Sequence, residues 1–106
     1  QHVDLALCLT ERDHLGESIQ AVARYYYLEA SNSAEVAFVI KESKRGKGMA
    51  KALLSELIAI AKVRGLEQLV ACVRRDNAPM LKVFENAGFL RKPSDDYDEV
   101  SLAYTL

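Results

Sequence analysis

The sequence predicts a single α/β domain built on a mixed sheet, and three observations lead to this fold class. The chain has 106 residues, half of them hydrophobic and 27% charged, which suits one domain with a packed core. Up to residue 41 the apolar residues fall in short strand-like runs, whereas from Gly48 they follow the spacing of a helical face. Antiparallel strands should therefore come first, followed by one strand–helix–strand unit with parallel strands and with helices packed on the sheet.

Three strands are expected before the glycine-rich turn. Residues 3–10 and 19–28 have the composition of strands, and the polar stretch 11–18 separates them as a turn. A second turn cluster at 29–33 precedes a third strand at 35–40, EVAFVI. Because this third strand is nearly all apolar, we expect it to lie in the centre of the sheet, covered on both faces.

Two helices and three further strands are expected after the glycine-rich turn. In chain order they are a helix at 48–64, a strand at 69–73, a helix at 78–87, and strands at 89–91 and 100–104. Gly65 is a natural stop for the first helix and Gly88 for the second. Either Asp76 or Asn77 can cap the second helix, which tolerates Pro79 in its first turn.

Charge and composition exclude several classes of function. With a formal net charge of −1, the chain has no global field that would recruit nucleic acid or an acidic membrane. No stretch approaches the ~20 apolar residues of a membrane span, and no signal peptide is visible. His2 and His14 lack ligand spacing, so we expect no metal. Cys8 and Cys72 lie in apolar runs, and we expect buried thiols in a protein of the reducing cytoplasm.

The stretch SKRGKGMAKALL, residues 43–54, carries the main functional signal. A basic, glycine-rich turn that leads into a helix suits an anion, because the first-turn N–H groups have no intrahelical acceptor. The string GxxxxGK[ST] is absent, and GxGxxG would need a glycine where Lys51 stands, so two nucleotide loops are set aside. What remains is RGKGMA, residues 45–50, whose glycines let the backbone approach a pyrophosphate. Taken alone, such a turn is equally consistent with a solvated loop.

Together with its neighbours, this stretch resembles the GNAT superfamily of acetyl-CoA-dependent N-acetyltransferases. The strand AEVAFVI, a short link, RGKGMA and the amphipathic helix look like the cofactor motif of that superfamily. Its second motif, NxxAxxxYxxxGF, is matched by Asn77, Met80, Phe84, Gly88 and Phe89. The resemblance spans residues 1–106 and begins at the second strand of the family fold. It implies that an opening strand and two helices are missing, so that the chain is a fragment of a longer protein or a truncated domain.

The resemblance also implies where acetyl-CoA would bind. Its pantetheine arm would pair with the backbone of Phe38, Val39 and Ile40 like an added strand. Asn77 would hydrogen-bond the arm from the opposite side. Phe84 would pack against the cofactor, at the position where the family often has a tyrosine that protonates the leaving thiolate. The pyrophosphate would lie on the loop and the first helical turn, held by Arg45, Gly46, Lys47, Gly48, Met49, Ala50 and Lys51.

Glu35 is the candidate general base. A glutamate that opens an apolar strand is unusual, because strands disfavour Glu and burial of its charge is unfavourable. The five steps from Glu35 to Ile40 span roughly 17 Å, about the length of a pantetheine arm, so an arm held at the loop brings its thioester towards Glu35. In the implied mechanism Glu35, directly or through a water, deprotonates the amine in a ternary complex, and a backbone N–H near Val39 stabilises the oxyanion. The alternative is a glutamate that only faces solvent at a strand end.

Three interpretations of the activity stay open. ARYYYLEASNSAEVAFVI and NAPMLKVFENAGF look most like the GNAT domain of bacterial Pat-type protein lysine acetyltransferases. That resemblance implies, as acceptor, a lysine of a metabolic enzyme such as an acyl-CoA synthetase. A small-molecule amine is the alternative acceptor. The third interpretation is a non-catalytic domain that binds acetyl-CoA as a sensor, since the family's acceptor-site helices are missing.

Overall fold

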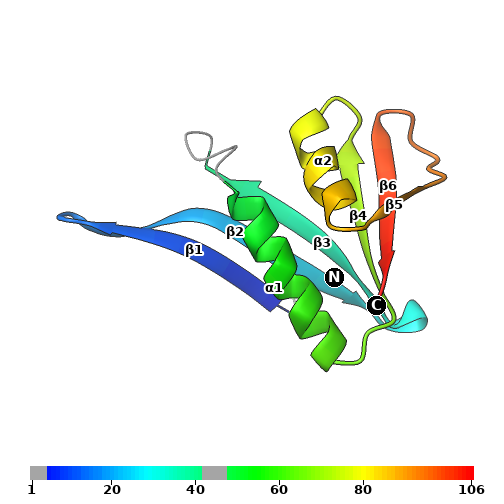
Figure 1. The fold of residues 1–106 in the computed structure, drawn as a ribbon, viewed down its shortest axis with the longest axis horizontal. Helices are drawn as coiled ribbons and strands as arrows, with labels where there is room; N and C mark the ends of the chain where they lie inside the picture. The colour runs from blue at the N-terminus through cyan, green and yellow to red at the C-terminus, as the bar shows by residue number, and fades with distance from the viewer. Residues whose placement is uncertain (1–4, 42–47) are drawn as a thin grey trace.

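The computed structural model describes residues 5–41 and 48–106, which form one six-stranded sheet with two helices on one face (Figure 1). The elements are β1 (Leu5–Asp13), β2 (Gly16–Leu28), the short 3-10 turn η1 (Glu29–Ser31), β3 (Ser33–Ile40), α1 (Met49–Val63), β4 (Gln68–Arg74), α2 (Ala78–Asn86), β5 (Leu90–Lys92) and β6 (Glu99–Thr105). The strand order is β1-β2-β3-β4-β6-β5, and of the adjacent strands in the described residues only β3 and β4 are parallel. The predicted order of elements and the mixed α/β class are confirmed.

The first two strands form a longer hairpin than predicted. β1 and β2 pair from Leu5–Tyr25 as far as Asp13–Gly16, so the expected turn at 11–18 is wrong. The Oδ1 atom of Asp13 accepts a hydrogen bond from the backbone N–H of Leu15 at 2.8 Å, and Gly16 takes a φ of 120°. This end of the hairpin is exposed on both faces, so its strands carry polar side chains without the alternation by which strands are recognised.

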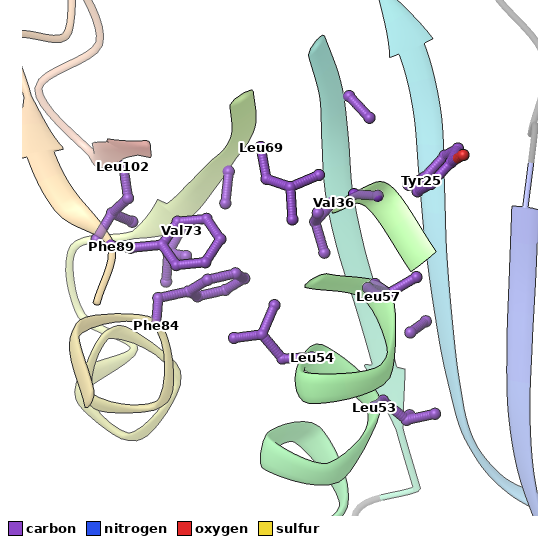
Figure 2. Packing of buried hydrophobic residues seen from close by; sticks show 14 of the residues in the cluster. Tyr25, Val36, Leu53, Leu54, Leu57, Leu69, Val73, Phe84, Phe89 and Leu102 are labelled. Carbon is purple, nitrogen blue, oxygen red and sulfur yellow. The ribbon is translucent and has the colours of Figure 1, made fainter. Parts of the chain in front are cut away.

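The core lies between the sheet and the two helices, as Figure 2 shows from close by. α1 presents a buried apolar stripe with Leu54 and Leu57 at its centre, because its apolar residues recur at the helical period. α2 contributes Phe84, whose ring centroid lies 5.6 Å from that of Phe38 on β3. The ring centroid of Phe84 also lies 4.9 Å from that of Phe89. These aromatic rings connect β3, α2 and the segment before β5 on the helix-covered face.

Two turns that lie side by side fix where β3 and β4 begin. Asn32, which precedes β3, adopts a left-handed conformation with φ of 47°. Its side-chain Nδ2 donates to the backbone oxygen of Gly65 at 3.0 Å, and its own backbone oxygen accepts from the N–H of Glu67 at 2.9 Å. The turn before β4 is thus hydrogen-bonded to the turn before β3, which sets the register of the two parallel strands.

The parallel pairing of β3 with β4 is short, and the sheet divides beyond it. Residues 33–35 pair with residues 68–70, after which β3 continues to Ile40 beside β2 and β4 continues to Arg74 beside β6. Within the described residues, β3 and β4 have no ladder past Glu35 and Val70. We call the space between the diverging strands the split. α1 packs over β1, β2 and β3, on one side of the split, and α2 lies on the other side (Figure 1).

One face of the sheet is not covered by any described helix, which corrects two expectations. Ala37 and Val39 of β3 point to this uncovered face and are exposed, Val39 by 63%, so the strand is central but covered on one face only. Cys8 and Cys72 are exposed free thiols rather than buried ones. Both errors have one cause, because an apolar residue in a strand is buried only if something packs on its side of the sheet. Neither described helix is long and apolar enough to cross a membrane.

We predict that Gly88→Ala destabilises the fold by about 1–3 kcal/mol. Gly88 has a φ of 106°, and a Cβ atom there would lie 3.0 Å from Cε2 of Tyr104. That ring cannot move freely because it packs against Phe89 at 5.3 Å between centroids. Urea unfolding gives the free energy of unfolding. The matched control is Gly65→Ala, which has a φ of 75° and open space at the Cβ position. Equal losses for both variants would show that the contact with Tyr104 contributes nothing.

Candidate active site

The ends of three elements meet at one edge of the sheet. Because β3 and β4 are parallel, their carboxyl ends point to the same edge. The N-terminus of α1 lies near the end of β3, and the N-terminus of α2 follows the end of β4 (Figure 1). The split therefore opens between two helix N-termini, each of which carries a partial positive charge.

The first turn of α1 is the described part of the predicted anion loop. Gly48 is the N-cap residue with a φ of 80°, a left-handed conformation that favours glycine. The backbone N–H groups that follow it have no intrahelical acceptor. Ala50 is buried against the sheet and Lys51 is exposed. Of the predicted phosphate-binding residues, Gly48, Met49, Ala50 and Lys51 are placed at this helix end, whereas Arg45, Gly46 and Lys47 lie outside the described residues.

The edge of β3 that faces the split has backbone groups without a strand partner. Residues 36–40 pair with β2 on one side, and in the described structure no strand pairs with them on the other. Extended backbone of this kind presents alternating N–H and C=O groups that can bind an extended ligand chain. Phe38, Val39 and Ile40, the residues predicted to pair with the pantetheine arm, lie on this segment.

Asn77 caps α2 across the split. Its Oδ1 atom accepts a hydrogen bond from the backbone N–H of Met80 at 3.3 Å, so of the two expected caps it is Asn77 that acts. Asp76 instead forms an ion pair with Arg74, with 3.3 Å between Oδ1 and Nε. The Nδ2 group of Asn77 donates no hydrogen bond to any described residue. The capping interaction thus holds the amide in place and leaves its donor available at the mouth of the split.

Phe84 is a core residue in this structure. Its side chain is only 2% exposed and packs between Phe38 and Phe89. A phenyl ring has no proton to give to a leaving thiolate, so Phe84 cannot act as a general acid. Its predicted contact with the cofactor stays a prediction, and its observed role is to connect α2 with β3 across the helix-covered side of the split.

Glu35 stands where β3 and β4 part. It pairs with Tyr26 of β2 and with Val70 of β4, and Glu35–Val70 is the last position of the parallel ladder. Ala34 and Val36 on either side of it are buried under the helices. The alternation of a strand therefore places the half-buried Glu35 side chain on the uncovered face. A carboxylate at this point can accept a proton from a group that approaches the split from that face.

A hollow on the uncovered face was not predicted from the sequence. It has a volume of about 420 Å³ and its polar side chains come from β4, β5 and β6: Gln68, Cys72, Lys92 and Ser101. These residues belong to no motif, and they meet only through the cross-strand register of three strands. Each of these residues takes part in the alternation of side chains along its own strand, which is a signal in the sequence. That alternation does not indicate which strands are neighbours.

A parallel strand pair that divides beside the N-terminus of a helix, with a helix-capping asparagine opposite, is the architecture of an acyl-CoA-dependent acetyltransferase domain. Residues 4–89 match the acetyltransferase (GNAT) family, and the chain belongs to this family. Acetyl-CoA is the acyl donor that this family uses. The resemblance stated from the motifs is confirmed.

Relatives of the chain carry acetyltransferase names. A Bacillus subtilis (strain 168) protein named as a candidate phosphinothricin acetyltransferase, YwnH, is 42% identical over 59 residues, which cover 56% of this chain and 36% of that protein. The GNAT domain of S. lividans PAT is 34% identical with a TM-score of 0.74, over 83% of this chain and 55% of that one. The structure of a candidate phosphinothricin N-acetyltransferase is 32% identical with a TM-score of 0.72, over 90% of this chain and 68% of that one. The chain thus spans about a third of the length of the Bacillus subtilis protein and about half of the length of the S. lividans domain.

We predict that Asn77→Ala lowers the free energy of unfolding by about 1 kcal/mol, because the N-terminus of α2 loses its side-chain cap. Asn77→Asp keeps an oxygen acceptor at the same place and should retain the stability of the parent. Urea unfolding of the three proteins checks this. If the alanine variant unfolds at the parent's urea midpoint, the hydrogen bond to Met80 does not stabilise α2.

Proposed function

We propose that this domain transfers the acetyl group of acetyl-CoA to a primary amine, by direct transfer in a ternary complex. The observation that carries the proposal is the split, whose unpaired β3 edge leads to the free N-terminus of α1. Such an edge suits the amides of a pantetheine arm, and such a helix end suits a pyrophosphate. Membership of the GNAT family supports the same assignment.

The proposed cofactor pose uses the residues named from the sequence. The pyrophosphate binds residues 45–51, and the arm follows the backbone of residues 38–40. Asn77 donates from Nδ2 to a carbonyl oxygen of the arm, since its Oδ1 is occupied by the cap. The pose is supported by the placement of the described members of this set on the borders of the split.

Glu35 is the proposed general base, acting directly or through a water. Val39 lies four residues further along β3, a distance of about 13 Å along a strand. A thioester oxygen bound by a backbone N–H near Val39 would therefore lie beyond the reach of the Glu35 carboxylate. The attacking amine would lie between them, level with Ala37, and its proton would pass to the carboxylate directly or through a bridging water.

The leaving group can depart without a protein acid. An acceptor ammonium has a pKa of about 10.4 and must lose a proton before its nitrogen can attack. Glu35 takes that proton, and the free amine attacks the thioester carbonyl to form the C–N bond. The tetrahedral intermediate then breaks its C–S bond and loses the second N–H proton to solvent. The CoA thiolate, which has a pKa of about 8.5 when free, leaves and later takes a proton from solvent. This route suits a site in which Phe84 stands at the position of the usual tyrosine.

A small-molecule amine is the proposed acceptor, and a protein lysine is the second candidate. The small amine is supported by two relatives whose names refer to acetylation of phosphinothricin. The lysine, on an enzyme such as an acyl-CoA synthetase, is supported by the resemblance to Pat-type domains in residues 23–40 and 77–89. Both acceptors and the cofactor suit the cytoplasm, where we propose that the protein acts.

We predict that Glu35→Gln lowers kcat by about 100- to 10,000-fold, because the amide cannot accept the proton. The dissociation constant for acetyl-CoA should stay unchanged, since Glu35 lies away from the cofactor's phosphates. Release of CoA thiol with a panel of amines measures turnover, and calorimetry measures binding. Glu56→Gln, at an exposed position on α1, is the matched control.

Two results would contradict this scheme in different ways. A Glu35→Gln protein with full activity would remove Glu35 from the role of base while leaving the transferase. A parent protein that binds acetyl-CoA but releases no thiol with any amine would instead support the sensor interpretation.

We predict that Asn77→Asp and Asn77→Ala both weaken acetyl-CoA binding by about 3- to 10-fold, the effect of losing one hydrogen bond. Only the alanine variant should also lose stability, so the pair separates binding from capping. Calorimetric titration with acetyl-CoA gives the affinities. Parent-like affinity in the aspartate variant would exclude Nδ2 as a cofactor ligand.

A further inference from the structure

The hollow on the uncovered face lies beside the split. On that face β4 carries Val70 and Cys72, and β6 carries Ser101 and Ala103, all of which line the hollow. Cys72 pairs with Ser101, and Ser101 in turn pairs with Lys92 of β5. One row of side chains therefore crosses three strands, from the thiol at the border of the split to the ammonium group at the outer strand.

This row is level with the place of the acceptor amine. The parallel register sets Glu35 opposite Val70 as the last pair of the ladder, and Ala37 and Cys72 each lie two residues further along their diverging strands, on opposite sides of the split. The amine lies level with Ala37 in the proposed mechanism. Adjacent strands are about 4.8 Å apart, so Ser101 lies one strand spacing beyond Cys72 and Lys92 lies two. The flexible Lys92 side chain can cover the distance back towards Ser101.

The polar groups of the hollow suit an anion. Lys92 provides an ammonium group, Ser101 a hydroxyl and Gln68 an amide, whereas no described carboxylate lines the hollow. The ion pairs among the described residues are Arg74–Asp76 and Arg91–Glu85, so Lys92 has no carboxylate partner there. The hydroxyl oxygen of Ser101 lies 3.9 Å from the sulfur of Cys72, a weak contact that leaves the hydroxyl able to donate to a ligand.

We propose that Lys92, with Ser101, binds an acidic group of the acceptor, so that the acceptor is a small molecule with both an amine and an acid. This inference rests on the proposed function, because it takes the position of the amine from it. An amine and a carboxylate separated by four methylene groups are roughly 6 Å apart in an extended chain. With the amine at the split, such a carboxylate reaches Ser101 and the ammonium group of Lys92. Val70 and Ala103 provide the apolar floor for the methylene groups.

The test uses two acceptors that differ only in charge, 5-aminopentanoate and its primary amide. The parent should prefer the acid, with kcat/KM higher by about tenfold or more, the effect of one charge-assisted hydrogen bond. In Lys92→Gln this preference should fall by about tenfold, and Lys92→Arg should restore most of it. Lys82→Gln, an exposed lysine on α2, should keep the parent's preference. An unchanged preference in Lys92→Gln would overturn the subsite and leave the transferase intact.

A binding measurement keeps the inference testable if no acetyl transfer is detected. The amide resonances of Ser101 and Ala103 are followed by NMR while 5-aminopentanoate is added to the protein with CoA. Shifts that saturate in the parent and vanish in Lys92→Gln support the subsite even if the proposed transfer fails. If the acid causes no shifts, or if it and its amide cause the same shifts, the subsite is wrong.

Discussion

The short parallel ladder between β3 and β4 is the interaction on which the rest of the molecule depends. It pairs three residues of each strand, and it is started by the hydrogen bonds that join Asn32 to the turn before β4. Each strand then follows its own antiparallel neighbour, and the natural twist of sheets carries the two pairs apart. A longer ladder would satisfy the backbone of β3 internally and close the split, so the proposed binding of acetyl-CoA requires that the ladder stop at Glu35.

The two sides of the split are held at a fixed spacing by apolar contacts on the helix-covered face. Phe38 of β3, Phe84 of α2 and Phe89 form a continuous set of ring contacts, which Tyr104 of β6 extends. These contacts lie under the helices, whereas the polar residues of the hollow lie on the opposite face. The fold thereby separates packing from the proposed chemistry: one face of each strand packs against the helices, and the other carries Glu35, Ser101 and Lys92.

The order of the elements could be predicted from the sequence, although the length of the β1–β2 hairpin could not. Gly48 marks a helix start and Glu35 interrupts an apolar run, so both candidate site residues could be proposed from local pattern, whereas local pattern allowed either Asp76 or Asn77 as the cap of α2. Cross-strand partners could not be predicted from local pattern. The pairing of Ser101 with Cys72 and Lys92 depends on the register of the strands, and these residues are far apart in the sequence. The same limit explains why the thiols were wrongly expected to be buried. The sequence does not show which face of β4 the helices cover, and Cys72 lies on the uncovered face.

The far end of the β1–β2 hairpin has a different consequence. From Glu11 to Ile19 every side chain is exposed, so this segment is held by backbone hydrogen bonds and small polar contacts, such as that of the Thr10 hydroxyl with Glu17. β1 is the edge strand of the described sheet, and charged residues there, among them Arg12 and Asp13, discourage this edge from pairing with another molecule. Segments of this kind open first and tolerate changes of length. This end of the β1–β2 hairpin is therefore the natural place to insert a tag or a second domain without disturbing the split.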